Sequence, residues 1–301
     1  MSARYQLAKM VLSSSAAIEL SKAEYEALIG AVKKLLSCLD AEEKFDCVIE
    51  NYRDLEKYIL DQALQALFSS AELDDVAWQA PRNTTARKLA NLLSSVRLYQ
   101  DTIGRDATAI TGDDAAADKI KAAKSAQFDS SLSYRTLDAV RNYAQHHALP
   151  VHGFSVKGEW TKDRKFSESE FAPMISVSEL AADPDFKPTT LAELKAGLAE
   201  LELKPMVREY VECLSTIHHH FRESTKSPVD EQLRIITEAK ARLFAAFPDE
   251  RDIGVAVFLA DEHGIQIGEE TAISEAMRKY LDFLQRKNRH LANFARRRIK
   301  Y

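Results

Sequence analysis

The chain has 301 residues, of which 46% are apolar, and a formal net charge of −5. This length and composition can fill the core of one large or two small domains, which excludes a disordered protein. The longest apolar runs, such as VAVFLA at 255–260, are far shorter than the roughly 20 residues that cross a bilayer. The first residues lack the basic, apolar and small-residue order of a signal peptide. We therefore expect a globular, cytoplasmic protein that makes no membrane contact.

Helical periodicity dominates residues 20–150. Apolar residues recur at spacings of three and four, which places each set on one face of a helix. The expected helices lie at about 22–39, 42–68, 81–103 and 131–149. The segment at 111–125 continues the third of these or forms a helix of its own. Ser130 or Ser131 can cap the 131–149 helix and Pro150 ends it. About four helices in this region predict a helical bundle.

The pattern changes after Pro150. Alternating residues predict short strands at 151–160 and 171–180, with loops at 165–170 and 183–188. Helical spacing returns at 189–221, at 229–247 and at 271–299, and the last helix is expected to bury Met277, Tyr280, Leu281 and Leu284. A hairpin is predicted at 252–270 with its turn at Asp261–Gly264. The expected fold is mainly α: a helical bundle at 20–150, packed against a largely helical half at 151–301 with a small hairpin or sheet.

One helix end concentrates reactive side chains. The sequence RNYAQHH at 141–147 places Arg141, Asn142, His146 and His147 in the final turns before Pro150. An Arg followed four to six residues later by a His also arises by chance in a chain of this length. The position at the end of an amphipathic helix, which closes a run of about four, makes the cluster a candidate site.

These residues resemble the Arg-x4-6-His motif of the HEPN superfamily. The match consists of Arg141, Asn142 and His146, with His147 also at an allowed spacing, and it covers about residues 40–150. The resemblance implies an all-helical domain that cleaves RNA without a metal or cofactor, in a toxin or antiviral role. It also implies a homodimer that joins two motifs, and an antitoxin or defence-system partner. Some members are inactive, so the alternative is a non-catalytic protein-interaction or RNA-binding module with a relic motif.

The chemistry of these residue types fits such cleavage. An imidazole such as that of His146 can take the 2′-hydroxyl proton or protonate the leaving 5′-oxygen. The Arg141 guanidinium can hold two phosphate oxygens, and Asn142 adds a neutral donor. The expected products end in a 2′,3′-cyclic phosphate. On a straight helix, however, Arg141 and His146 lie about 140° apart. Convergence needs a loosened helix end or a second protomer; otherwise Arg141 pairs with an acid inside the bundle and the histidines cap the helix.

Other candidates supplement this cluster. Tyr99 and Asp101 are accessory candidates near the bundle interior, and Asp101 could orient a histidine or neutralise Arg141. The histidines of IHHHF at 217–221 lack the spacing of a zinc helix, so no metal site is predicted. The stretch from Arg286 carries seven Lys or Arg and no acid, which leaves −12 on the rest of the chain. The expected RNA-phosphate contacts in this stretch are Arg296, Arg297, Arg298 and Lys300. The alternative is that they neutralise part of that negative charge.

Overall fold

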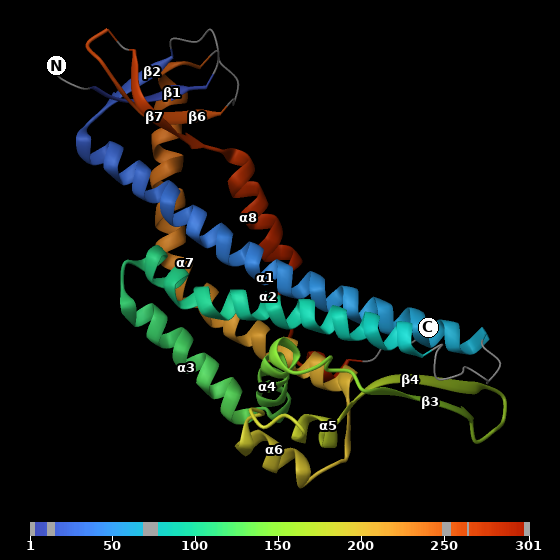
Figure 1. The fold of residues 1–301 in the computed structure, drawn as a ribbon. Helices are drawn as coiled ribbons and strands as arrows, with labels where there is room; N and C mark the ends of the chain where they lie inside the picture. The colour runs from blue at the N-terminus through green and yellow to red at the C-terminus, as the bar shows by residue number, and fades with distance from the viewer. Residues whose placement is uncertain (1–3, 11–15, 69–77, 249–253, 264, 298–301) are drawn as a thin grey trace. The chain divides into compact units, whose positions relative to one another are not determined.

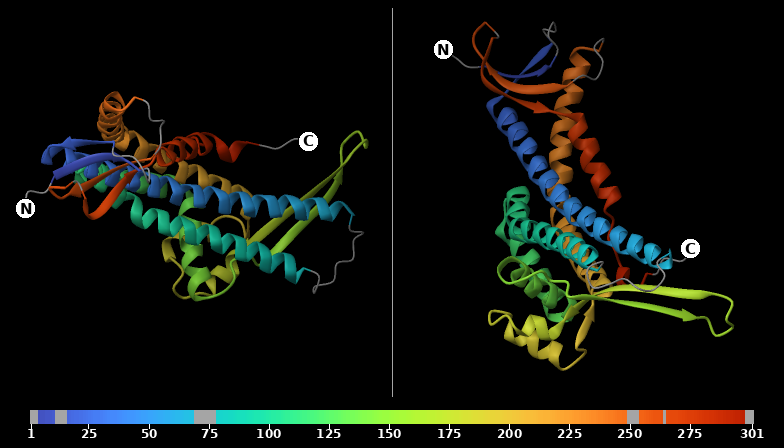
Figure 2. Two further views of the ribbon diagram at one scale, coloured as in Figure 1. Left: turned by 90° about the horizontal axis from the view of Figure 1, so that it is seen from above. Right: turned by 45° about the vertical axis from the view of Figure 1, so that its right-hand side comes forward.

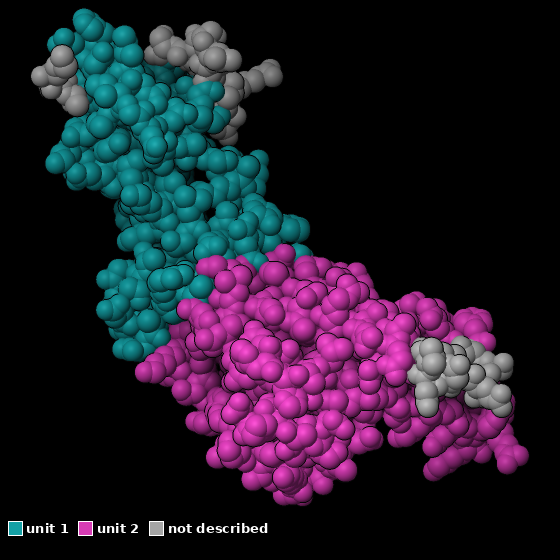
Figure 3. All heavy atoms as spheres, viewed as in Figure 1, with its two compact units in different colours: residues 1–43, 102–119, 221–289 teal, residues 44–101, 120–220, 290–301 magenta. Residues whose placement is uncertain are grey.

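The protein is described by a computed structural model that covers residues 4–10, 16–68, 78–248, 254–263 and 265–297 (Figure 1). The described chain is mainly helical and carries two small antiparallel sheets, as the sequence predicts. It forms two compact units, coloured separately in Figure 3. Unit 1 comprises residues 1–43, 102–119 and 221–289, and unit 2 comprises residues 44–101, 120–220 and 290–301. The predicted division into 20–150 and 151–301 stays a prediction about which parts fold independently.

The sheet of unit 1 is built from both ends of the chain. Its strands are β1 (Arg4–Lys9), β2 (Ala17–Leu20), β6 (Val255–Ala260) and β7 (Gln266–Ile273), in the order β2-β1-β6-β7. All neighbours are antiparallel, and β1 pairs with β6 from Arg4 opposite Ala260 to Lys9 opposite Val255. The hairpin of β6 and β7 confirms the predicted one. Strands β1 and β2 were not predicted.

Helical segments complete unit 1: residues 22–43 of α1 (Lys22–Phe68), residues 221–246 of α7 (Leu203–Ala246), all of α8 (Glu275–Lys287), and the adjoining ends of α2 (Gln79–Thr111) and α3 (Asp114–Ser130) within residues 102–119. Helix α1 begins at a capping box, because Ser21 Oγ accepts the Glu24 N–H and the Glu24 carboxylate accepts the Ser21 N–H. The hydrogen bond from the Ser21 N–H, together with one from the Arg242 side chain, lowers the pKa of Glu24 to about 2.

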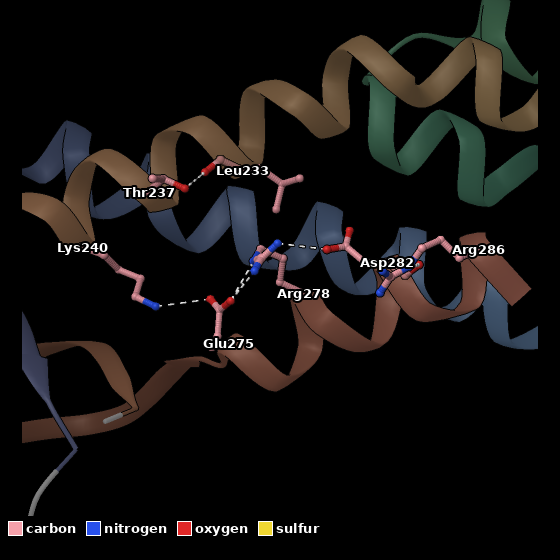
Figure 4. A network of polar contacts seen from close by, with 7 residues as sticks. All are labelled: Leu233, Thr237, Lys240, Glu275, Arg278, Asp282 and Arg286. Atoms are coloured by element: carbon pink, nitrogen blue, oxygen red, sulfur yellow. Dashed lines mark hydrogen bonds and ion pairs between the residues drawn. The ribbon is translucent and has the colours of Figure 1, made fainter. Parts of the chain in front are cut away.

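Ion pairs join the helices of unit 1. Glu42 of α1 is fully buried, and its carboxylate accepts hydrogen bonds from Nε and Nη2 of Arg222 on α7, at 2.8 and 2.5 Å. Arg222 Nη1 donates to the carbonyl oxygen of Asn288, which follows α8. Figure 4 shows a second, more exposed network, in which Glu275 of α8 lies 3.5 Å from Lys240 of α7 and accepts from Arg278. Both networks fix α8 on α7.

The helical part of unit 2 contains α4 (Leu132–His146) and the segments of α1, α2, α3 and α7 in residues 44–68, 79–101, 120–130 and 203–220. Aromatic side chains fill its core, among them Phe45, Tyr99, Tyr143 and Tyr210. Four helices precede Pro150 in the described chain, but they are not the four expected ones: α1 covers two of those, and the segment at 111–125 forms a helix of its own, α3.

A second sheet follows these helices. Strands β3 (Gly153–Trp160), β4 (Ser167–Ser176) and β5 (Glu200–Glu202) are antiparallel in the order β3-β4-β5, and the short helices α5 (Val177–Ala181) and α6 (Pro188–Lys195) lie between β4 and β5 in the chain. Strand β5 pairs only with Met174–Ser176. The rest of β3 and β4 therefore forms a two-stranded ribbon that projects from the bundle (Figure 2).

Several predicted boundaries were wrong. The helices expected at 22–39 and 42–68 are one helix, α1, because no breaker separates their apolar faces. The segments at 203–221 and 229–247 likewise merge into α7, which continues through Pro228 and buries Phe221, Val229 and Ile236 on either side of it. Residues 167–170, expected in a loop, belong to β4 because they pair with β3. The segment at 189–202 is not one helix with α7 but forms α6 and β5.

The prediction of a basic C-terminal helix that reaches residue 299 was also wrong. Helix α8 ends at Lys287, and residues 294–296 form a short 3-10 helix. The Glu212 carboxylate accepts the N–H groups of Asn293 and Ala295, both at 2.9 Å, and so binds the segment in its non-helical path. Of the four side chains expected to be buried by this helix, Leu281 and Leu284 are buried, Met277 is half-buried and Tyr280 is exposed.

Candidate functional site

Helix α4 carries the predicted motif. Ser131 caps it by accepting the Tyr134 N–H, as one of the two expected capping residues. Tyr134, Leu137, Val140 and Tyr143 form its buried face. The helix ends at His146, and the N–H of the C-cap residue His147 donates to the Tyr143 carbonyl oxygen at 2.9 Å. The residues that follow the last core contact, including both histidines, are therefore exposed at the helix end.

A groove of about 660 Å³ lies beside the C-terminal half of α4. Its other wall is the segment at 183–188, where Pro184 and Pro188 stiffen the backbone. The polar side chains that line the groove are Asp138, Asn142, Tyr143, His146, His147, Asp183, Asp185 and Lys187. The structure thus brings three of the four motif residues, Asn142, His146 and His147, to one hollow surface.

His147 and Asp183 form the closest acid–imidazole pair of the groove. His147 Nδ1 lies 3.8 Å from Asp183 Oδ1, beyond hydrogen-bond distance but close enough for attraction to a protonated ring. Asp183 is itself nearly buried, and its Oδ1 accepts the Asp185 N–H at 3.0 Å. This bond holds the carboxylate in place beside the imidazole of His147.

Tyr143 forms the floor of the groove and is supported by His152. The Tyr143 hydroxyl lies 3.2 Å from His152 Nε2, while His152 Nδ1 accepts the Ser176 N–H at 3.0 Å. Because Nδ1 is an acceptor, the proton of a neutral His152 lies on Nε2, which donates to the tyrosine oxygen. Burial lowers the pKa of His152, and burial with nearby Glu179 and Asp183 raises the pKa of Tyr143.

The neutral state of His152 predicts a pH dependence of stability. The pKa of His152 is lower in the folded than in the unfolded chain. The free energy of unfolding therefore includes the full contribution of His152 above about pH 6.5, and this contribution is lost as the pH falls from there towards the folded-state pKa. We expect the melting temperature of the wild type to fall more steeply below pH 6.5 than that of His152→Gln. Parallel curves for the two proteins would contradict this assignment.

Arg141 is not among the described residues that line the groove. Only 12% of its side chain is exposed; Nη2 donates to Asn142 Oδ1 at 2.8 Å and Nη1 lies 3.9 Å from Asp138 Oδ1. Its Nε and Nη1 atoms are buried and have no hydrogen-bond partner within the described residues. Arg141 and His146 therefore do not converge within one chain, as the helical geometry indicated.

Arg141 is expected to stabilise the fold. Replacing it with alanine removes a long, mostly buried stem, and we expect a loss of about 1–3 kcal/mol in unfolding free energy. The measurement is denaturant unfolding followed by circular dichroism. The matched control is Arg87→Ala, which truncates an exposed arginine of α2 and is expected to change stability by less than about 0.5 kcal/mol. Unchanged stability of Arg141→Ala, combined with lost RNA cleavage, would instead assign Arg141 a catalytic role.

The two accessory candidates lie apart from the groove lining. Tyr99 is fully buried, and its hydroxyl is 3.1 Å from His218 Nδ1, whose ring stacks on Phe45. Asp101 is exposed and pairs with Arg97 at 2.5 Å, one helical turn earlier. These contacts place Tyr99 in the core of unit 2 and Asp101 on the exposed surface of α2.

The C-terminal candidates are only partly described. Arg296 and Arg297 are exposed, and Arg297 Nη2 donates to the Ala292 carbonyl oxygen. Arg298 and Lys300 lie outside the described residues. Arg208 of α7 donates to the Arg297 carbonyl oxygen and pairs with Glu56, so the segment is fixed on unit 2. Its predicted contact with RNA phosphates stays a prediction.

No group of three or more His, Cys, Asp or Glu side chains within the described ranges is arranged to hold a metal ion. The histidines of IHHHF point to different neighbours: His218 stacks on Phe45, and His219 stacks on His290. Among the residues that the structure describes, no helix is long and apolar enough to cross a membrane.

Asp183 and Lys187 are groove residues that the sequence did not identify. The DPDFKP segment was correctly predicted as a loop, but nothing in its composition shows that it faces α4. Its two prolines, two acids and one lysine indicate a stiff polar loop, and this is the only local feature of the segment that could have pointed to a binding site.

Comparison of the chain with protein-family models, curated proteins and solved structures found no match.

Proposed function

We propose that unit 2 is a metal-independent endoribonuclease and that the α4 groove is its active site. The observation that carries this proposal is the presence of His146, His147, Asp183 and Lys187 on one groove of about 660 Å³. Cleavage by the 2′-hydroxyl requires two proton-transfer groups and a cation, and this set offers two imidazoles and an ammonium. The resemblance to HEPN proteins adds support from the sequence.

The groove suggests a role for each residue. His147, oriented by Asp183, takes the 2′-hydroxyl proton, and the 2′-oxygen attacks the adjacent phosphorus as the bond to the 5′-oxygen breaks. His146 gives a proton to that leaving oxygen. Lys187 and the Asn142 side chain stabilise the charge on the phosphate oxygens. The products carry a 2′,3′-cyclic phosphate and a 5′-hydroxyl. In this scheme Lys187, and not Arg141, is the cation that contacts the phosphate within a single chain.

The proposal is tested by incubating the purified protein with end-labelled single-stranded RNA in EDTA. We expect cleavage, and we expect cyclic phosphate ends that resist phosphatase until they are opened by acid. The control is His263→Ala, which removes an exposed histidine of unit 1 and leaves cleavage unchanged. A folded wild-type protein that leaves RNA intact, or one whose activity disappears only in EDTA, would contradict the proposal.

The position of Arg141 favours a second candidate. A relic motif needs no convergent Arg and His, and the Arg141 side chain is mostly buried and bonded to Asn142. In that case the fold is a non-catalytic RNA-binding or protein-interaction module. The toxin or antiviral role, the homodimer and a neutralising partner remain predictions from the resemblance to HEPN proteins.

A further inference from the structure

The ribbon formed by β3 and β4 ends in an exposed turn with the sequence WTKDRKF, residues 160–166. Trp160 and Phe166 flank the turn and are 66% and 69% exposed. Between them lie three exposed cations, Lys162, Arg164 and Lys165, and one acid, Asp163. Exposed aromatic rings beside cations are typical of a surface that binds a charged partner with flat or apolar groups.

The turn has a defined shape. The Asp163 carboxylate accepts from Thr161 Oγ1 at 2.5 Å and from the Lys165 N–H at 3.2 Å, and these bonds lower its pKa. The Thr161 N–H donates to the Phe166 carbonyl oxygen, and Arg164 has a φ of 56°, in the left-handed region. The acid thus supports the turn and lies 4.0 Å from Lys165 Nζ, while Lys162 and Arg164 form no ion pair within the described residues.

The two rings lie on opposite faces of the ribbon. Trp160 is directly opposite Ser167 in the register, so these two side chains share a face. Phe166 precedes Ser167, and adjacent strand residues point to opposite faces, so its ring lies on the other one. One ring is therefore available on each side of the cationic turn.

The pattern of charges below the turn limits the partner. Glu159 and Glu168 are directly opposite each other on the Phe166 face. Insertion of the tip into an anionic bilayer would bring both carboxylates towards the lipid headgroups. A single polyanionic strand that crosses the tip need approach only the turn, where bases can stack on the rings and phosphates can contact the cations.

We propose that the WTKDRKF turn is a single-stranded RNA-binding site in which Trp160 and Phe166 stack on bases and Lys162, Arg164 and Lys165 contact phosphates. The choice of RNA over another single-stranded polyanion rests on the proposed function. The turn holds the strand and takes no part in the proton transfers of the α4 groove.

The test uses the full chain and a fluorescein-labelled 2′-O-methyl oligouridylate, which lacks the 2′-hydroxyl and cannot be cleaved by this route. Anisotropy titrations give its dissociation constant. Trp160→Ala and Phe166→Ala should each weaken binding by about tenfold, because each removes one stacked base. Replacing Lys162, Arg164 and Lys165 together with Gln should lower the slope of log Kd against log salt concentration by about two, because three phosphate contacts are lost. In a Trp78→Phe background, Trp160 is the one tryptophan, and its fluorescence should be quenched by the oligonucleotide.

The matched control is Lys157→Gln, which removes an exposed cation opposite Glu170 on the same ribbon and should leave binding unchanged. Circular dichroism melting checks that each variant is folded. Wild-type affinity in both ring variants would overturn the inference. So would binding to phosphatidylglycerol vesicles that the ring substitutions abolish, when the oligonucleotide does not bind. RNA that is bound through the turn but never cleaved would contradict the proposed function and leave this inference intact.

Discussion

Replacing His147 with alanine is expected to slow RNA cleavage by about 100-fold or more, because a positioned general base contributes roughly 10²–10⁴ to the rate. The structure places this imidazole in the groove, with Nδ1 3.8 Å from Oδ1 of Asp183. The measurement is the single-turnover cleavage rate at saturating protein. His147 is exposed at the helix end, so the substitution should leave the melting temperature nearly unchanged.

The neighbouring groove residues serve as graded comparisons. His146→Ala should also slow cleavage by about 100-fold, because it removes the proposed acid. Asp183→Asn should have a smaller effect, since the amide keeps the shape but does not stabilise a cationic His147. Cleavage at the wild-type rate by folded His147→Ala, with loss in His146→Ala alone, would assign the base to another group. Full activity in both variants would contradict an active site in this groove.

Replacing Arg222 with methionine is expected to lower the unfolding free energy by about 3–5 kcal/mol, because it removes a positive charge and two hydrogen bonds from the buried carboxylate of Glu42. Arg222 donates two hydrogen bonds to Glu42 and a third to the Asn288 carbonyl oxygen. Denaturant unfolding gives the free energy. The double variant Glu42→Leu/Arg222→Met should recover much of the loss, since neither charge of this pair then remains.

The matched control is Arg234→Met on the same helix. Arg234 also pairs with two carboxylates, Glu231 and Glu238, but its side chain is 55% exposed. Exposed pairs contribute about 0–1 kcal/mol, so the control should be close to the wild type. Equal losses for Arg222→Met and Arg234→Met would mean that burial does not determine the energy of these ion pairs.

The sequence predicted the parts of the fold that depend on local periodicity. The amphipathic helices, the Ser131 cap and the hairpin of β6 and β7 follow from residue spacing within short windows. Strands β1 and β2 were missed because β1 depends on its pairing with β6, which no local pattern contains. The path after Asn288 was missed for a similar reason, since Glu212 and Ser215 of α7 bind that segment.

The candidate site shows the same limit. Helical geometry predicted the separation of Arg141 from His146, and the structure places Arg141 outside the groove lining. The sequence could not show that residues 183–188 would face α4 and supply Asp183 and Lys187. That contact is formed between segments with different periodicity, and it depends on how α5 and α6 pack.

The pairing of β1 with β6 also constrains the order of events during synthesis. Strand β1 leaves the ribosome first among the described elements, yet its central partner emerges only after α7 has been made. Until then the Leu7 side chain, which is fully buried in the finished sheet, and one edge of β1 remain uncovered. A nascent chain therefore carries an aggregation-prone edge until β6 has been made, and chaperones that bind exposed strands would act on this protein from early in its synthesis.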